Sequence, residues 1–165
     1  MAEKTFVESR AEMERVLLDG GIGYLGVSFQ GHPYVVPLNY HYSEGKIYFH
    51  CALKGRKLDA IAENPEVCFT VGRQMGEVRE HAGSTCHVDS ESVICYGKAR
   101  VIEDLEERGK ALNLFNRRFR PDAPDIPEER VKNCAVVEIT IAEMTGRREQ
   151  ERKRTHWRHS FEEAK

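Results

Sequence analysis

The sequence contains 165 residues, of which 40% are hydrophobic and 32% are charged, and its formal net charge is -2. A chain of this length suits one domain with a real core, and its composition excludes a disordered protein. The small net charge gives no reason to expect a nucleic-acid partner. No apolar run approaches the ~18 residues of a membrane span, and the opening residues, MAEKTFVESR, lack the apolar centre of a signal peptide.

The cysteines bear on the compartment in which the protein works. An odd number of cysteines without close pairing is typical of reduced thiols rather than of a disulfide framework. The five cysteines are Cys51, Cys68, Cys86, Cys95 and Cys134. Together with the missing membrane and export signals, they predict a cytoplasmic protein.

A helix followed by three strands is predicted in the first third of the chain. Ser9 and Glu12 have the spacing of a capping box, and the helix that they open ends at Gly20. Alternating apolar residues from Ile22 then predict a strand that ends at the turn QGHP. The segments YVVPLNYHY (34–42) and KIYFHC (46–51) predict two further antiparallel strands. Within the second strand, proline 37 cannot donate to a neighbouring strand and indicates an edge or a bulge.

The remaining elements alternate short strands with helices. A short helix at 58–63 precedes a strand at 66–71, and a long strand is predicted at 92–103. Asp104 opens another helix, and a proline-rich loop separates it from a last strand at 134–146. The polar residues 72–91 give no assignment. The pattern favours a mainly β fold with peripheral helices, a six-stranded antiparallel barrel that is closed or nearly closed, because closure hides strand edges.

The joint between the strand that ends at Cys51 and the following helix carries an unusual charge. A helix N-terminus has about half a positive charge and free N–H groups, so cations there are unfavourable unless an anion binds. In this sequence Gly55 is followed directly by Arg56 and Lys57. Glycine lets backbone approach a ligand closely, and the two cations add charge-assisted donors. The pattern is typical of a phosphate site, and a solvated basic turn is the alternative.

Two longer stretches resemble a known family. The stretches are GYLGVSFQGHPYVVPLNYHYSEGKIYFHCALKGRKLDAIAENPEVCFTV (23–71) and SVICYGKARVIEDLEE (92–107). They are similar to the flavin-binding split-barrel proteins related to pyridoxamine 5'-phosphate oxidase, in particular the nitroimidazole-resistance-like branch. The resemblance covers roughly residues 12–146. It implies a homodimer of six-stranded split barrels with FMN in a groove at the subunit interface.

The resemblance also implies which residues bind FMN. Arg56 and Lys57, after Gly55, match the positions that hold the phosphate. The other matched positions lie beside the isoalloxazine ring, along the strand that leads from the ring to the phosphate, and in a further flavin-side segment. They are Val36, Pro37, Leu38, Asn39 and Tyr40; Phe49, His50, Cys51 and Ala52; and Ser92 and Val93.

Individual polar residues within these segments allow more than one interpretation. His50 matches a histidine beside the flavin and could relay a proton. The alternative is a histidine of the barrel whose hydrogen bonds are satisfied within the protein. Cys51 is interpreted as a small buried hydrophobe rather than a redox thiol. Asn39 could hydrogen-bond the flavin edge or face water. The segment HAGSTCH is interpreted as a polar loop and not as a metal site, because the spacing of His81, Cys86 and His87 fits no standard zinc finger.

The resemblance favours an FMN-dependent oxidoreductase. It would reduce a small electrophile, such as a nitroaromatic or a quinone, with electrons from a nicotinamide or another donor. One alternative is a haem-binding or haem-degrading protein with His50, His156 or His159 as the iron ligand. Another is a flavin carrier or sensor without turnover, and a deazaflavin could replace FMN.

The C-terminal segment departs from the family pattern. Residues 1–146 are expected to form the FMN-binding split-barrel domain, followed by a charged tail or helix at 147–165. The tail contains seven Lys/Arg and four Glu, with Trp157 and Phe161 among them. Such a basic segment could touch nucleic acid or a membrane surface. We expect instead that the aromatic pair docks on its own protein or on a twin subunit, with no nucleic-acid or membrane partner.

Overall fold

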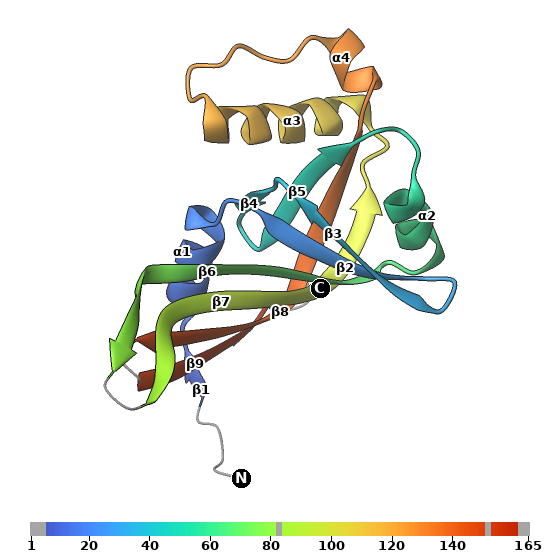
Figure 1. The fold of residues 1–165 in the computed structure, drawn as a ribbon. Coiled ribbons are helices and arrows are strands. Elements are labelled where there is room, and N and C mark those ends of the chain that lie inside the picture. The colour runs from blue at the N-terminus through green and yellow to red at the C-terminus, as the bar shows by residue number, and fades with distance from the viewer. Residues whose placement is uncertain (1–5, 82–83, 151–152, 162–165) are drawn as a thin grey trace.

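A computed structural model of the protein describes residues 6–81, 84–150 and 153–161 (Figure 1). Four helices are present in these ranges: α1 (Arg10–Asp19), α2 (Arg56–Glu63), α3 (Leu105–Phe119) and α4 (Glu128–Lys132). The strands of the same ranges are β1 (Phe6–Glu8), β2 (Gly23–Phe29), β3 (His32–Leu38), β4 (His41–Ser43), β5 (Lys46–Cys51), β6 (Glu66–His81), β7 (Ser84–Val101), β8 (Ala135–Gln150) and β9 (Lys153–Ser160). The mainly β fold with peripheral helices is confirmed, with nine strands in the described ranges where six were predicted.

All of these strands belong to one sheet. Its order is β1-β9-β8-β7-β6-β2-β3, with β5 paired to a separate stretch of β8 and β4 paired to β5. The pairs are antiparallel except for β1 with β9. Among the described strands, β3 pairs only with β2, and β4 pairs only with β5. The sheet is therefore not closed. This confirms the split barrel that the family resemblance implies and corrects the closed or nearly closed barrel that the strand pattern alone favoured.

The polar residues 72–91 extend two strands into a long hairpin. β6 and β7 stay paired through Gly72↔Ser92 to Met75↔Asp89, with irregular register further out. The polar residues of this arm hide the alternation that sequence reasoning needs, and Figure 1 shows the arm at one end of the sheet. The side chains of His81, Cys86 and His87 lie outside the described part of the structure.

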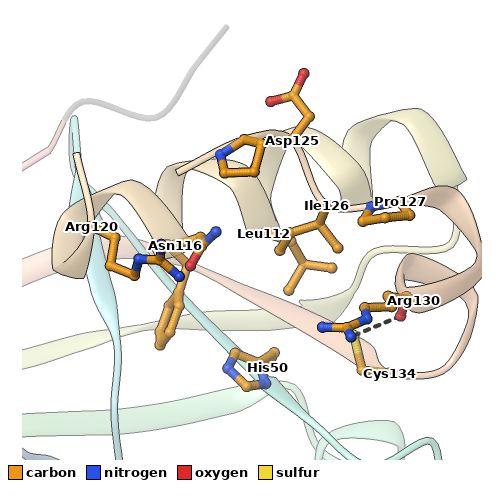
Figure 2. A pocket seen from close by; sticks show the side chains of 11 residues that line it. His50, Leu112, Asn116, Arg120, Asp125, Ile126, Pro127, Arg130 and Cys134 are labelled. Carbon is orange, nitrogen blue, oxygen red and sulfur yellow. Dashed lines mark hydrogen bonds between the residues drawn. The ribbon is translucent and has the colours of Figure 1, made fainter. Parts of the chain in front are cut away.

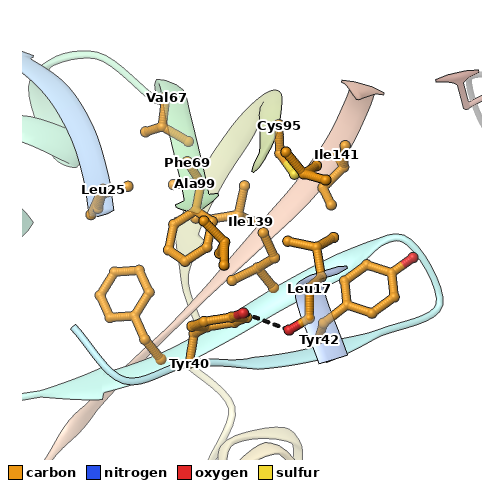
Figure 3. Packing of buried hydrophobic residues seen from close by; sticks show 14 of the residues in the cluster. Leu17, Leu25, Tyr40, Tyr42, Val67, Phe69, Cys95, Ala99, Ile139 and Ile141 are labelled. Atoms are coloured by element: carbon orange, nitrogen blue, oxygen red, sulfur yellow. Dashed lines mark hydrogen bonds between the residues drawn. The ribbon is translucent and has the colours of Figure 1, made fainter. Parts of the chain in front are cut away.

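The sheet wraps round an apolar core. Residues of β2, β5, β6, β7 and β8 form this core together with one face of α1, and Figure 3 shows Leu25, Phe69 and Ile139 packed in it. A second, smaller apolar cluster lies beneath α3 and α4 and includes Leu112, Val131 and Val136. In the described part of the chain, no helix is long and apolar enough to cross a membrane.

The C-terminal segment forms strands where a tail or helix was expected. β8 runs through position 146 to Gln150, and β9 pairs back on it. The Trp157 side chain is buried in the core, and Phe161 packs against the same core. The docking of the aromatic pair on its own protein is confirmed. The physical basis is the pairing of β9 with β8. This pairing places Trp157 of β9, and Phe161 directly after β9, against the core.

Candidate functional site

The predicted phosphate joint lies where β5 leads into α2. Gly55 is the N-cap of α2 with φ 147°, a backbone conformation that favours glycine, and no atom lies within 4 Å of the position where a Cβ would be. The backbone N–H groups of Leu58 and Asp59 donate to the Gly55 carbonyl at 2.9 and 3.2 Å. No side chain caps this helix start. The joint is therefore open to solvent and free of a protein cap.

The two cations of the joint have no carboxylate partner among the described residues. The Arg56 guanidinium lies over the Tyr34 ring of β3, 5.5 Å from its centroid, and is exposed. Lys57 is half-buried and forms no ion pair with a described residue. A cavity of about 280 Å³ lies between Arg56 and the β2–β3 turn. Positive charge at a helix start without a protein partner favours a bound anion.

β3 contributes a strand edge beside this joint. Val36 and Leu38 pack against the core, whereas Pro37 and Asn39 are exposed. On its far side β3 has no pairing partner among the described strands, so its backbone is available to a ligand, as the position of Pro37 indicated.

Tyr40, at the end of this predicted segment, has a different environment. Its side chain is fully buried, its hydroxyl donates to the Leu17 carbonyl at 2.5 Å, and its ring meets Phe69 edge-on (Figure 3). The Tyr40 side chain therefore belongs to the core and does not face a ligand groove.

β5 alternates between core and surface at the predicted site. Phe49 is buried in the core, His50 points outward, and Ala52 is exposed. Cys51 is half-buried, and burial raises the pKa of its thiol. A thiol with a raised pKa is protonated and weakly nucleophilic, which favours the interpretation of Cys51 as a small hydrophobe.

His50 lies against α3. The Phe115 ring meets the His50 ring edge-on, with 4.8 Å between centroids. His50 remains open to solvent on another side, yet partial burial lowers its pKa from the ordinary value. The imidazole is therefore mainly neutral at neutral pH and can accept or release a proton close to that range.

A cavity of about 500 Å³ opens beside His50, between β5, α3 and the 120–127 loop (Figure 2). Its lining includes Phe115, Asn116 and Arg120 from α3 and its end, and Arg130 from α4. Sequence reasoning missed these residues. The one signal in the sequence was the proline-rich loop, which begins at Arg120 and ends at Arg130.

Ser92 and Val93 lie far from the joint within one chain. Ser92 pairs with Arg147 of β8, whereas Cys51 pairs with Ala135 at the other end of that strand. At ~3.3 Å per residue, the two positions are separated by roughly 40 Å along β8. The Val93 side chain is also fully buried in the core. The β7 segment is nearer to β3 than to the joint, because Ile94 pairs with Thr70 of β6, and β6 pairs with β2, the partner of β3.

Comparison with known proteins places this arrangement in a family. The family model of pyridoxamine 5'-phosphate oxidase matches residues 9–148. No curated protein matches the sequence.

Solved structures with the same fold include three with distinct descriptions. A candidate 5-nitroimidazole antibiotic resistance protein from Bacteroides thetaiotaomicron is 29% identical with a TM-score of 0.76, over 87% of this chain and 86% of that one. An FAD-binding protein from Mesorhizobium loti is 25% identical with a TM-score of 0.63, over 86% and 96%. The flavocytochrome Anf3 from Azotobacter vinelandii, at 18% identity and a TM-score of 0.77 over 96% and 81%, shows the fold alone. Since the family model spans most of the chain and the split sheet agrees with it, the chain belongs to the pyridoxamine 5'-phosphate oxidase family.

Proposed function

We propose that this protein binds FMN and acts as an oxidoreductase that reduces a small electrophile, such as a nitroaromatic or a quinone. The observation that carries the proposal is the α2 start, where Arg56 and Lys57 follow an uncapped Gly55 and have no carboxylate partner among the described residues. A phosphate would supply the missing negative charge.

The residues beside the joint fit the rest of a flavin. β3 has no strand partner on its outer edge among the described strands, and Asn39 adds an exposed amide beside that edge. Arg56 already stacks on Tyr34, which holds its guanidinium at the cavity. These groups would hold the ring edge and the phosphate, respectively.

The chemistry divides between cofactor and protein. FMN, when bound, would supply the electron transfer, and the protein would supply binding, orientation and proton movement. His50 would hold or release a proton in this site, with a pKa that burial lowers from its ordinary value. We also propose that a nicotinamide or another donor supplies the electrons.

Similar proteins support a flavin as the cofactor. The candidate 5-nitroimidazole resistance protein and the FAD-binding protein are similar to this chain at 29% and 25% identity. The flavocytochrome is similar only in fold, so the experiment must also be able to detect haem. The absorption spectrum and mass of the molecule that copurifies with the chain distinguish FMN from FAD, a deazaflavin and haem.

A homodimer is part of the proposal. Ser92 lies near the opposite end of β8 from the strand that leads to the joint. The corresponding segment of a second copy could reach it if two chains pair across the open edge of the sheet.

The phosphate assignment is tested by comparing FMN with riboflavin. Each charge-assisted contact to the phosphate contributes about 1.5 to 3 kcal/mol. The double variant Arg56→Ala with Lys57→Ala is therefore expected to weaken FMN by ~100-fold to 10,000-fold, at ~1.4 kcal/mol per tenfold. Riboflavin, which has no phosphate, should bind the variant and the wild type nearly alike.

Titration of both ligands into the apo-proteins measures the difference. Lys54→Ala is the matched control, because it removes an exposed cation from the same turn, one residue before Gly55. An equal loss of FMN and riboflavin would mean that the two cations support the fold or the ring instead of the phosphate.

A further inference from the structure

Contacts within the protein fix the shape of the cavity beside His50. Its roof is α3, its far wall is the 120–127 loop with α4, and its floor is β5 (Figure 2). The backbone N–H of Ile126 donates to the Asn113 side chain at 2.8 Å, and Asp125 pairs with Arg117 at 2.5 Å. These contacts hold the loop to α3, so the cavity exists without a ligand.

The lining of the cavity is largely apolar near α3. Leu112, Phe115 and Ile126 face it, and Leu112 also belongs to the apolar cluster under α3 and α4. Cavities that combine an apolar wall with a few convergent polar groups are the usual form of small-molecule sites. The Phe115 ring provides a flat surface that already contacts His50.

The charge of the cavity is positive. Arg120 and Arg130 approach it from opposite ends in Figure 2. Neither guanidinium has an ion-pair or side-chain hydrogen-bond partner in the part of the chain that the structure describes. The acidic residue of the lining, Asp125, is already paired with Arg117. Two arginines thus remain available at the rim of an apolar cavity.

The other polar groups of the cavity do not cancel this charge. The Asn116 amide also lacks a partner among the described side chains, and it can donate or accept. Burial raises the pKa of the Cys134 thiol, which is therefore neutral at neutral pH. His50, with its lowered pKa, is mainly neutral as well.

We propose that this cavity binds a small organic anion, an aromatic carboxylate or a molecule of the same chemistry. Arg120 or Arg130, at the two ends of the cavity, would bind the acid group through charge-assisted hydrogen bonds, and Phe115 and Leu112 would contact the flat apolar body. The end of the molecule opposite the acid group would then lie at His50. That this anion is the substrate rests on the proposed function, whereas its binding does not.

Two probes of equal size and different charge test the proposal. They are para-nitrobenzoate, an anion, and para-nitrobenzamide, its neutral counterpart, titrated by calorimetry into the purified full-length protein. The anion is expected to bind at least about tenfold more tightly, because hydrogen bonds to charged groups are stronger than neutral ones. Raising the salt concentration should weaken the anion alone, since both arginines are exposed.

Single variants locate the binding. Arg120→Gln or Arg130→Gln, whichever removes the arginine that holds the acid group, should lower the affinity for para-nitrobenzoate by about tenfold, and both variants should leave para-nitrobenzamide within about twofold. The matched controls are Lys110→Gln on α3 and Lys132→Gln on α4, which each remove an exposed cation that does not line the cavity. Unchanged amide binding shows that the variants are folded.

The outcomes separate this proposal from the proposed function. If the two probes bind equally, or if the arginine variants behave like the lysine controls, the anion site is overturned while FMN binding can still stand. If the purified chain binds no flavin but the arginine variants lose the anion as expected, the anion site stands and the oxidoreductase proposal falls.

Discussion

Glu91 is a buried carboxylate that joins three separate elements to β7. It accepts hydrogen bonds from Arg15 of α1 at 2.6 Å, Arg73 of β6 at 2.7 Å and Arg148 of β8 at 3.1 Å. A buried charge is tolerated only when it is paired and hydrogen-bonded, and three arginines meet that condition here. Glu138 has a similar role, with Lys46, Tyr48 and Arg100 as its partners.

The Glu91 cluster makes stability depend on pH. Burial alone would raise the pKa of Glu91, but the hydrogen bonds from the arginines outweigh it, and the pKa is lowered. A lowered folded-state pKa contributes stability that is present at neutral pH and lost as the pH falls through that pKa. We expect Glu91→Gln to cost about 2 to 3 kcal/mol at neutral pH and much less in acid.

Urea unfolding of the wild type and the variant at both pH values measures this difference. Glu106→Gln, which removes an exposed partner of Lys110, should cost less than about 0.5 kcal/mol. A pH-independent cost for Glu91→Gln would show that packing, and not charge, is lost.

His50 is the residue on which the proposed chemistry depends most directly. If it donates a proton, His50→Ala should retain FMN and the fold and slow substrate reduction by ~100-fold, the usual scale for general acid catalysis. Because its pKa lies below the ordinary 6.5, the wild-type rate should rise as the pH falls through that pKa. Steady-state kinetics across acid and neutral pH test both points, and a variant with the wild-type rate and profile would reduce His50 to a packing role.

At the scale of elements, Arg118 fastens the C-terminal end of α3 to its neighbours. The Arg118 guanidinium donates to the carbonyls of Tyr40 at 2.5 Å, Gly20 at 2.6 Å and Leu18 at 3.1 Å. It also lies over the Tyr40 ring, 4.8 Å from the centroid. Arg118 thereby joins α3 to the end of α1 and to the short segment between β3 and β4.

Loss of this arginine should affect both stability and the environment of His50. Arg118→Ala leaves three carbonyls without a donor, and we expect it to cost about 2 to 3 kcal/mol. Because α3 carries Phe115, a looser helix should expose the His50 ring and raise its pKa toward the ordinary value. Chemical unfolding and an NMR titration of the histidine measure the two effects.

Two variants on the same helix sharpen the comparison. Arg118→Lys keeps the charge but cannot form the planar fork, so it should recover only part of the loss. Lys110→Ala should change neither the stability nor the titration, because its ion pair is exposed. An Arg118→Ala protein with an unchanged His50 pKa would show that other contacts fix α3.

At the scale of the whole molecule, the open sheet exposes apolar side chains beside its free edge. Tyr24, Val35 and Tyr96 are 45%, 61% and 46% exposed. Val35 and Tyr96 line a cavity of about 510 Å³ on the outer face of β2, β3, β6 and β7. Exposed apolar groups next to an unpaired strand are typical of an interface.

We therefore expect a dimer at micromolar concentration in sedimentation experiments. Val35→Asp should shift the protein toward monomer and weaken FMN, because it places a charge on the exposed apolar face. Leu114→Asp, on the outer face of α3, is the matched control and should leave the dimer intact. A wild-type protein that stays monomeric while FMN is tightly bound would contradict this arrangement.

Local patterns in the sequence determined several elements correctly. Alternation predicted β2, β5 and the end of β7 that continues from Ser92, because one face of each strand packs on the core. Asp104 caps α3 as its spacing with Glu107 predicts, with a 2.8 Å hydrogen bond. Ser9 precedes α1 but makes no side-chain cap hydrogen bond, and the Glu12 side chain accepts from Arg148 of a distant strand.

Tertiary structure decided what depends on partners far apart in the chain. The polar hairpin arm and β9 are strands because neighbouring strands satisfy their backbone hydrogen bonds, a requirement that leaves little trace in side-chain pattern. The sequence alone determined that a glycine and two cations open α2. Only the packing of α3 and its loop over β5 determined that His50 lies at a cavity whose two arginines have no partner among the described residues, because His50 and the rest of the lining are more than sixty positions apart.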